Sequence, residues 1–268
     1  MKKNTVFLIN KGKKFISIAP GVIGVIAGIF LLIKGSPVDW LGVFAFIFFM
    51  SFVFFGFFIY INIVVSREIN KAVKILDDKC DPEEFLDIIN EFEPVIDNKK
   101  MKAMLLVNKT AGLLSLGKHG EGIKLLESID TSKLNAPFEI VYYNNFAGVC
   151  IKIKEFEKAK INLDKVESLL IQNKIDGKIK KKLENIYKIN KVFWNMCNKK
   201  FDGCMETLNE ILAEADFMRA EIEIKFALGF YYMNNGDMAK AKECFAFVIA
   251  NGNKLYVVEE AREYLAAL

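Results

Sequence analysis

The chain has 268 residues, of which 53% are hydrophobic and 26% are charged, and its formal net charge is +4. Six lysines and one aspartate give residues 1–65 a charge of +5, so the rest of the chain carries −1. A nearly neutral remainder lacks the basic surface of nucleic-acid-binding domains, so no nucleic-acid partner is expected.

Two uncharged apolar blocks, residues 15–33 and 41–65, dominate the N-terminal quarter of the sequence. As helices they would extend about 28 and 37 Å, and the hydrocarbon core of a bilayer is about 30 Å thick. The seven residues between them contain Gly35 and Pro37 and leave room only for a tight turn. The sequence therefore predicts a transmembrane helical hairpin over residues 15–65, in contact with the lipid bilayer.

Two other interpretations of the first block are a cleaved signal peptide and a buried hairpin of a soluble protein. A signal peptide ends in a small-residue cleavage site, whereas residues 34–37 lead directly into a longer apolar block. A soluble hairpin needs a polar face on each helix, and neither block has one. The membrane hairpin is therefore favoured.

Basic residues on both sides of the hairpin predict its orientation. They are Lys2, Lys3, Lys11, Lys13 and Lys14 before it and Arg67, Lys71 and Lys74 after it. By the positive-inside rule both termini are expected in the cytoplasm. The lysine- and isoleucine-rich composition resembles that of proteins from AT-rich bacterial genomes, so we expect a multi-pass protein of a bacterial plasma membrane.

A pair of glycines in the first block predicts how the two spans pack. Gly24 and Gly28 form a small-x-x-x-small step, which allows a neighbouring helix to approach closely. The second block is rich in phenylalanine, so we expect its rings to cover these glycines. The same step also suits dimerisation, which leaves a homo-oligomer as an alternative.

After the hairpin, apolar residues recur at helical spacing. Ile69, Val73 and Leu76 indicate that the second span continues as an amphipathic helix to about Lys79. The expected layout is a basic cytoplasmic tail (1–14), the hairpin (15–65), a helical connector (66–100) and a helical domain (101–268).

The connector contains signals for a short, separate helix. Asp81 followed by Pro82 is typical of an N-cap and a first turn, and Pro94 ends the pattern. We expect this helix to reach about Glu91. No alternating apolar pattern typical of β-strands follows it.

The C-terminal segment has small and large apolar residues at fixed spacing around the turn at residues 235–237. They are Leu228, Gly229, Tyr232, Ala241, Phe245 and Val248. This spacing resembles a tetratricopeptide repeat (TPR), in which small residues lie where two antiparallel helices cross. The resemblance implies a stack of helix pairs.

Weaker copies of the second-helix pattern precede it. The small positions Gly122, Ala159, Cys204 and Ala241 are separated by 37, 45 and 37 residues, more than the family period of about 34. The glycine of the first helix is replaced by Thr110, Ala147 and Val192 in the first three copies. The resemblance covers about residues 101–268, and residues 256–265 would form a helix over the last repeat. The predicted fold is all-α, a transmembrane hairpin followed by a cytoplasmic TPR-like α-solenoid.

Residues for catalysis, cofactor binding or metal binding form no known pattern. His119, the only histidine, is expected in a solvated turn between two helices. The five cysteines include no C-x-x-C pair and are interpreted as free apolar residues. Glycine-rich phosphate loops are missing as well. We therefore expect a protein that is not an enzyme and that has no catalytic residues, cofactor or metal.

A run of lysines lies between the second and third copies. It comprises Lys174, Lys178, Lys180, Lys181, Lys182, Lys188 and Lys191. A solvated helix face is the usual meaning, and contact with the anionic inner leaflet is the alternative.

The resemblance also implies a concave groove, lined by the first helix of each repeat, that receives a protein or peptide. The repeat register places the following residues there: Met104, Val107, Leu114, Asn144, Ile151, Ile189, Phe193, Met196, Phe226, Phe230 and Met233. This apolar, methionine-rich set suits an amphipathic helix or an apolar peptide. The alternative is that these residues are buried between helices or covered by residues 66–79 of the same chain.

Two function hypotheses follow. In the first, the protein is a membrane-tethered TPR adaptor or scaffold that recruits a protein partner to the cytoplasmic face. In the second, it is an accessory subunit of a larger membrane complex for secretion or transport, assembled through the hairpin. Partner capture by a soluble fragment starting near Lys79 would favour the first.

Overall fold

A computed structural model describes residues 12, 14, 18, 23, 24 and 40–268 of the chain. In this part every regular element is a helix, as the sequence predicts. The chain divides into two compact units, Met1–Asn70 and Lys71–Leu268, and each is considered by itself. Most of the first predicted span lies outside the described residues, so the two-span hairpin stays a prediction.

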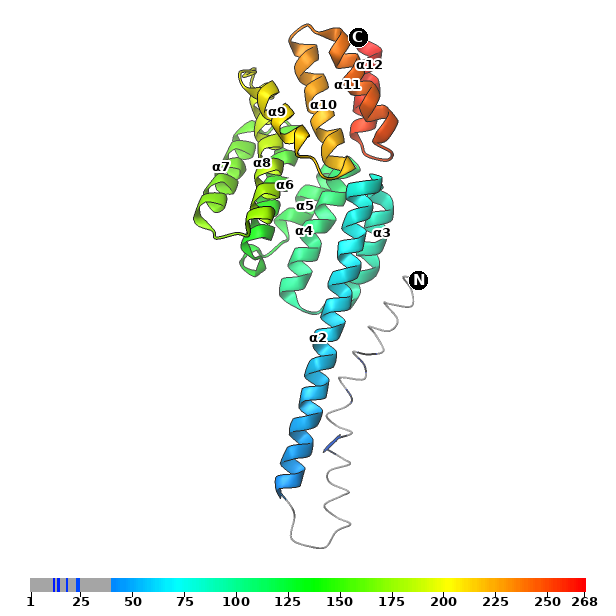
Figure 1. Cartoon of the computed structure of the whole chain (residues 1–268), viewed down its shortest axis with the longest axis vertical. Coiled ribbons are helices and arrows are strands. Elements are labelled where there is room, and N and C mark those ends of the chain that lie inside the picture. The colour runs from blue at the N-terminus through cyan, green and yellow to red at the C-terminus, as the bar shows by residue number, and fades with distance from the viewer. Residues whose placement is uncertain (1–11, 13, 15–17, 19–22, 25–39) are drawn as a thin grey trace. The chain divides into compact units, whose positions relative to one another are not determined.

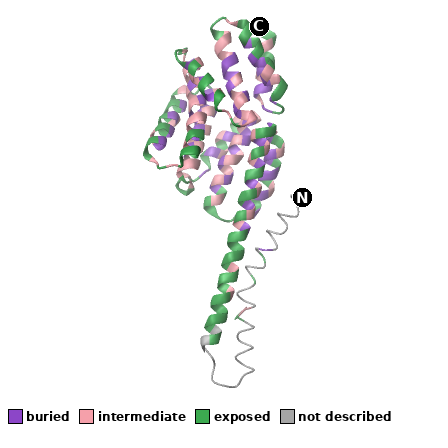
Figure 2. Cartoon of the chain, in the orientation of Figure 1, coloured by how far each residue is buried: buried purple, intermediate pink, exposed green. Residues whose placement is uncertain are grey.

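Helix α2 (Trp40–Lys79) is continuous over 40 residues, which confirms that the helix of the second apolar block continues to Lys79. Its part Phe44–Lys79 is the one helix in the described residues that is long and apolar enough to cross a membrane, with a mean hydropathy of 2.5 in its most apolar window. None of that window is buried within the protein. In Figure 2 the first part of α2 is mostly green, the colour of exposed residues.

The sequence predicts that phenylalanines of the second span pack over Gly24 and Gly28. Gly24 is exposed, and a Cβ atom built there would meet nothing within 4 Å. Gly28 lies outside the described residues. Gly12, in contrast, is buried, and a Cβ atom there would lie 3.1 Å from the side chains of Phe57 and Ile61. The described residues thus place Gly12, rather than Gly24, against phenylalanine of the second span.

The second unit contains the end of α2 and ten further α-helices, labelled in Figure 1 where there is room. These are α3 (Pro82–Phe92), α4 (Lys99–Ser115), α5 (His119–Glu127), α6 (Ala136–Lys152), α7 (Phe156–Gln172), α8 (Gly177–Cys197), α9 (Cys204–Ala213), α10 (Met218–Asn234), α11 (Met238–Asn251) and α12 (Val257–Ala267). Two short 3-10 helices, Glu93–Val95 and Thr131–Lys133, follow α3 and α5.

Asparagine and aspartate side chains define where several of these helices begin. The side chain of Asp81 accepts a hydrogen bond from the Glu84 N–H at 2.9 Å, as its sequence position predicts. Asn98, Asn135 and Asp237 cap α4, α6 and α11 in the same way. These bonds satisfy backbone N–H groups that have no partner inside the helix.

Consecutive helices pair as the repeat pattern predicts: α4 with α5, α6 with α7, α8 with α9, and α10 with α11. The four small positions of the second helices, Gly122, Ala159, Cys204 and Ala241, are all buried. At the last crossing, a Cβ atom on Gly229 would lie 2.7 Å from the Phe245 ring. No side chain fits there, so glycine allows α10 and α11 to approach closely.

Helix α12 covers the last pair, as predicted, and it contacts α11 and α10. The ring of Tyr264 stacks on that of Phe245 with centroids 5.3 Å apart. Buried apolar clusters lie between successive pairs, so each pair buries its apolar face only by stacking on its neighbours.

Candidate functional site

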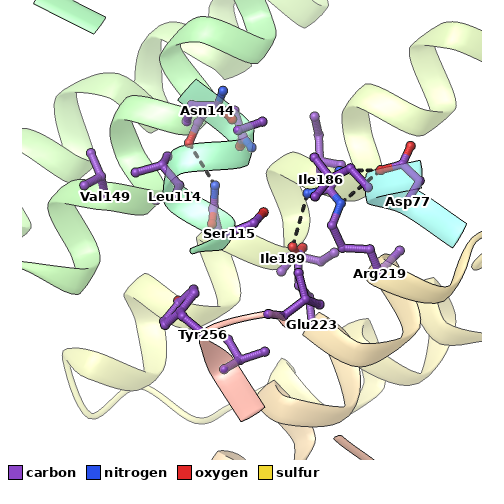
Figure 3. A pocket seen from close by; sticks show the side chains of 18 of the residues that line it. Asp77, Leu114, Ser115, Asn144, Val149, Ile186, Ile189, Arg219, Glu223 and Tyr256 are labelled. Carbon is purple, nitrogen blue, oxygen red and sulfur yellow. Dashed lines mark hydrogen bonds and ion pairs between the residues drawn. The ribbon is translucent and has the colours of Figure 1, made fainter. Parts of the chain in front are cut away.

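A cavity of about 270 Å³ lies in the second unit, among the first helices of the four pairs. Most of its lining comes from α4, α6, α8 and α10, and the rest comes from the end of α2, one residue each of α3 and α5, the residue just before α10 and the residues around the start of α12. Most lining side chains are apolar, and several charged and amide side chains lie among them (Figure 3). This is the side of the repeats on which the sequence predicts a groove.

The predicted groove residues divide into three groups. The first group lines the cavity: Leu114, Asn144, Ile151, Ile189, Phe193 and Phe226. The second group, Met104, Phe230 and Met233, is half-buried outside the cavity lining. The third group, Val107 and Met196, is 0% and 2% exposed and belongs to the core clusters. These two side chains do not line the cavity, because Val107 packs among residues of α5 and α6 and Met196 among residues of α9 and α10.

The methionine-rich character predicted for the groove is not found in this cavity, because no methionine is among its lining residues. One wall is instead formed by the chain itself, through Val73, Leu76 and Asp77 of α2. The interpretation that residues 66–79 cover the groove is thus correct in part. A partner helix would compete with α2 for this space.

The Asp77 carboxylate joins the end of α2 to α10. Its Oδ1 accepts a hydrogen bond from Arg219 Nε at 2.9 Å and lies 2.8 Å from Arg219 Nη2, and Arg219 Nη1 lies 3.3 Å from the Glu223 carboxylate. Figure 3 shows these three side chains together. The Asp77 and Arg219 side chains are only about one fifth exposed, so solvent screens their interaction less than that of a surface pair.

Burial shifts the pKa values of Arg219 and Glu223. It raises the pKa of the Glu223 carboxyl above its usual value, and the nearby Asp77 carboxylate adds to the effect. Burial alone would lower the pKa of Arg219, but the carboxylates of Glu223 and Asp77 reverse this and raise it. Arg219 is therefore a cation shared by two carboxyl groups.

Lys152 forms a second charged group on α6. Its Nζ lies 2.9 Å from the Glu260 carboxylate and 4.9 to 5.7 Å from the ring centroids of Tyr256, Phe226 and Phe193. Burial alone would lower the pKa of Lys152, but Tyr256 and Glu260 reverse this and raise it. Burial also raises the pKa of the Tyr256 hydroxyl to about 12. Lys152 is thus a fixed cation whose apolar surroundings are three aromatic rings.

His119 is not the solvated turn residue that the sequence suggests. It is the first residue of α5, it is half-buried, and it lines the cavity. Its ring meets that of Tyr256 edge to face, with centroids 5.3 Å apart. Burial and the nearby Lys152 lower the pKa of His119, so its imidazole is neutral at pH 7.

Amide side chains from α6 and α8 form the third polar group. Asn190 Nδ2 donates to the backbone carbonyl of Asn144 at 3.0 Å, and Asn145 Nδ2 donates to Thr110 Oγ1 at 3.2 Å. The side chain of Asn144 is different, because its residue is only 6% exposed and its Oδ1 has no hydrogen-bond partner. Buried amide oxygens without partners are rare in folded proteins.

The lysine run on α8 lies outside this cavity. Lys181, Lys182, Lys188 and Lys191 form ion pairs of 2.6 to 3.2 Å with Glu214, Asp216, Glu210 and Glu167. Each of these lysines is thereby matched with an acid of a neighbouring segment, which agrees with the usual meaning of a solvated helix face.

The described residues contain no group of three or more metal-ligating side chains. Burial raises the pKa of the Cys80 and Cys150 thiols to about 11, so both are protonated at neutral pH and are poor nucleophiles.

The residues that sequence reasoning missed are Asp77, Lys152, Arg219, Glu223 and Tyr256. They come from α2, α6, α10 and the start of α12, and no short motif contains more than two of them. Lys152, the last residue of α6, follows a run of apolar residues in the same helix. This single charge after an apolar run is the one local feature of the sequence that points to the site.

Comparison with known proteins supports the fold. Residues 91–250 match the family described as the SusR N-terminal TPR domain. No curated protein and no solved structure matches the chain. The match covers more than half of the chain and includes all four helix pairs. The chain therefore belongs to the TPR family, and within it to the SusR N-terminal TPR domain family.

Proposed function

We propose that this protein is a non-enzymatic, membrane-tethered adaptor, in which residues 15–65 form a two-span hairpin and the TPR domain recruits a protein partner at the cytoplasmic face. TPR domains are in general modules for protein interaction. The observation that carries the membrane part is the exposed phenylalanine surface of α2.

The apolar surface of α2 is too large for an aqueous environment. Phe48 is 77% exposed and Phe52 is 69% exposed, and six other phenylalanines from Phe44 to Phe58 are also exposed. Each buried phenylalanine would gain about 1.5–3 kcal/mol on leaving water. A lipid bilayer removes all of them from water at once, and residues 41–65 match its thickness.

The groove residues outside the cavity are the proposed contact points for a protein partner. Phe230 and Met233 at the C-terminal end of α10 and Met104 on α4 are half-buried, so each retains accessible apolar surface. Tethering to the membrane raises the local concentration of this surface, so a weak affinity suffices for recruitment.

Crosslinking in the native membrane tests this proposal. Photoreactive residues are placed singly at Phe230, at Phe52 and, as a control, at Ile161, which is 67% exposed on α7. The adaptor predicts that Phe230 captures one soluble or peripheral protein that Ile161 does not capture, and that Phe52 captures lipid.

Capture of one integral membrane protein from Phe52, with none from Phe230, would contradict the adaptor. It would support an accessory subunit assembled through its hairpin. A chain recovered in the soluble fraction would contradict both functions.

A further inference from the structure

The end of α2, residues 71–79, lies on the cavity side of the repeats, where Val73, Leu76 and Asp77 form one wall of the cavity. We propose that this segment is a latch, which moves away when a partner helix takes its place. Such a helix carries the same pattern as the latch, two aliphatic residues three positions apart followed directly by an acid. This inference rests on the proposed recruitment of a protein partner, because it concerns the kind of partner and its access to the repeats.

The latch has one face that packs against the repeats and one that does not. Ala72 and Leu76 are 0% and 2% exposed, whereas Lys74 and Asp78 are exposed. The two buried residues are four positions apart, as on one face of an amphipathic helix. A separate helix with the same apolar face therefore makes the same contacts once the latch has moved.

A charged contact decides which helix fits. Asp77 Oδ1 accepts a hydrogen bond from Arg219 Nε at 2.9 Å, and the Glu223 carboxylate lies 3.3 Å from Arg219 Nη1. When the latch moves away, Arg219 loses one of its two carboxylates, and the loss of a partner is unfavourable for a buried charge. A partner helix removes this penalty only if it supplies an acid at the position of Asp77.

Incomplete packing makes the latch replaceable. A cavity of about 270 Å³ lies beside Val73 and Leu76, whereas at the crossing of α10 and α11 a Cβ atom on Gly229 would lie 2.7 Å from the Phe245 ring. A cavity beside apolar side chains reduces the stability that their packing provides. A buried ion pair adds little net stability compared with apolar packing. The latch is therefore held in a defined position by contacts weaker than those within the repeats.

The backbone bends where the latch ends. Cys80 has a φ angle of 53°, in the left-handed region that residues other than glycine rarely adopt. Beyond this bend, Lys254 Nζ lies 2.9 and 3.0 Å from the carboxylates of Asp81 and Glu83, and α3 packs on α4. These contacts keep α3 on the repeats while the latch moves, so Cys80 is the hinge.

Hydrogen exchange of the full chain in nanodiscs of zwitterionic lipid, resolved by mass spectrometry, measures whether the latch is docked. Asp77→Arg places a second cation beside Arg219, so exchange of the backbone amides of residues 71–79 should rise roughly tenfold or more, while α11 stays protected. Asp78→Arg, the same change at the exposed neighbouring residue, should alter neither. Asp77→Arg combined with Arg219→Asp again places one arginine beside two carboxylates, so protection should return.

A synthetic helix tests replacement of the latch in the same nanodiscs. The probe is a fluorescent peptide of residues 66–79 with a hydrocarbon staple between Asn70 and Lys74, which are exposed in the chain. It should bind the Asp77→Arg chain roughly tenfold or more tightly than the wild-type chain, whose own latch competes at a high effective concentration. The same peptide with Asp77→Arg should bind neither chain, because it brings a cation to Arg219.

Three results would overturn the proposal. One is equal exchange of residues 71–79 in the Asp77→Arg and Asp78→Arg chains. Another is peptide binding that does not differ between the wild-type and Asp77→Arg chains, or between the peptide and its Asp77→Arg form. The third is a charge swap that does not restore protection. If α11 also exchanges faster in the Asp77→Arg chain, the repeats have unfolded, and Asp77→Asn against Asp78→Asn then decides the result in the same two measurements.

Neither measurement involves the recruited protein. A latch that fails these tests leaves recruitment through Phe230 and Met233 unaffected, and crosslinking from Phe230 tests that recruitment separately. A latch that passes them, with no protein captured from Phe230, would contradict recruitment alone.

Discussion

Two phenylalanines show the difference between the two parts of this protein. Phe52 lies in α2 and is 69% exposed, whereas Phe245 lies in α11 and is fully buried. Both are in regular helices that are rich in apolar residues. Among the described residues, the apolar surface around Phe52 is largely uncovered, whereas the neighbouring helices of the repeats enclose Phe245.

The lengths of the apolar stretches explain this contrast. In the repeats, the longest stretch without a charged residue has 12 residues, 140–151, and each helix keeps a polar face toward water. Residues 41–65 contain no charged residue. A phenylalanine in the repeats therefore depends on the next helix, whereas one in α2 depends on the surrounding medium.

The largest expected effect comes from removing the buried ring. Phe245→Ala should lower the free energy of unfolding of the TPR domain by about 3–5 kcal/mol, because it leaves a cavity beside Gly229 and Tyr264. Chemical denaturation measures this loss. Phe247→Ala on the same helix removes a half-buried ring and should cost less. Equal losses in the two variants would show that the crossing at Gly229 is not tightly packed.

The second largest expected effect is on membrane insertion by the exposed Phe52 of α2. Phe52→Arg should reduce insertion, because arginine at the centre of a span costs about 2.5–3.5 kcal/mol. Fractionation of cells into membrane and soluble parts measures it. Ile161→Arg, at an equally exposed site on α7, should change nothing. If both variants fractionate alike, the contrast between α2 and the repeats does not reflect a membrane.

A smaller effect is expected where α2 meets the repeats. Arg219→Gln should destabilise the domain by about 2 kcal/mol, less than the 3–5 kcal/mol of a fully buried pair, because the partners retain some exposure. The loss arises because Asp77 and Glu223 would face each other without a cation. Arg262→Gln, which removes a more exposed arginine on α12, should cost under about 1 kcal/mol. Thermal unfolding of the two variants measures the difference.

The smallest effect is at the N-cap of α3. Asp81→Ala should cost about 1 kcal/mol at pH 7. Burial would raise the pKa of Asp81, but the Glu84 N–H and the Lys254 ammonium lower it below its usual 3.8. The stabilisation by Asp81 is therefore present above about pH 3.8 and is lost as the pH falls through the lower pKa of the folded state.

Denaturation at pH 7 and at pH 3 measures this dependence. The gap between wild type and Asp81→Ala should narrow at the lower pH. Asp87→Ala, which removes an exposed carboxylate from the middle of α3, should show no such gap. A gap for Asp81→Ala that is constant with pH would mean that its charge does not contribute.

Local patterns were sufficient for the helices and their pairing. The Asp81 cap, the end of α2 at Lys79 and the small residues at the four crossings depend on neighbours within a few turns, so spacing alone predicted them. The apolar stretch of residues 41–65 could also be identified from the sequence, because the criterion is only that it contains no charged residue.

The composition of the cavity was decided by the tertiary structure. Asn144, Ile189 and Phe226, which the repeat register assigns to the groove, line the cavity, and the end of α2 brings Asp77 to Arg219, a residue 142 positions later in the chain. In a repeat protein the sequence pattern constrains only the residues at which the helices pack together. The residues between them are free to vary. Charged pairs arise where such positions from four helices and from α2 converge, and this convergence exists only once the helices have stacked.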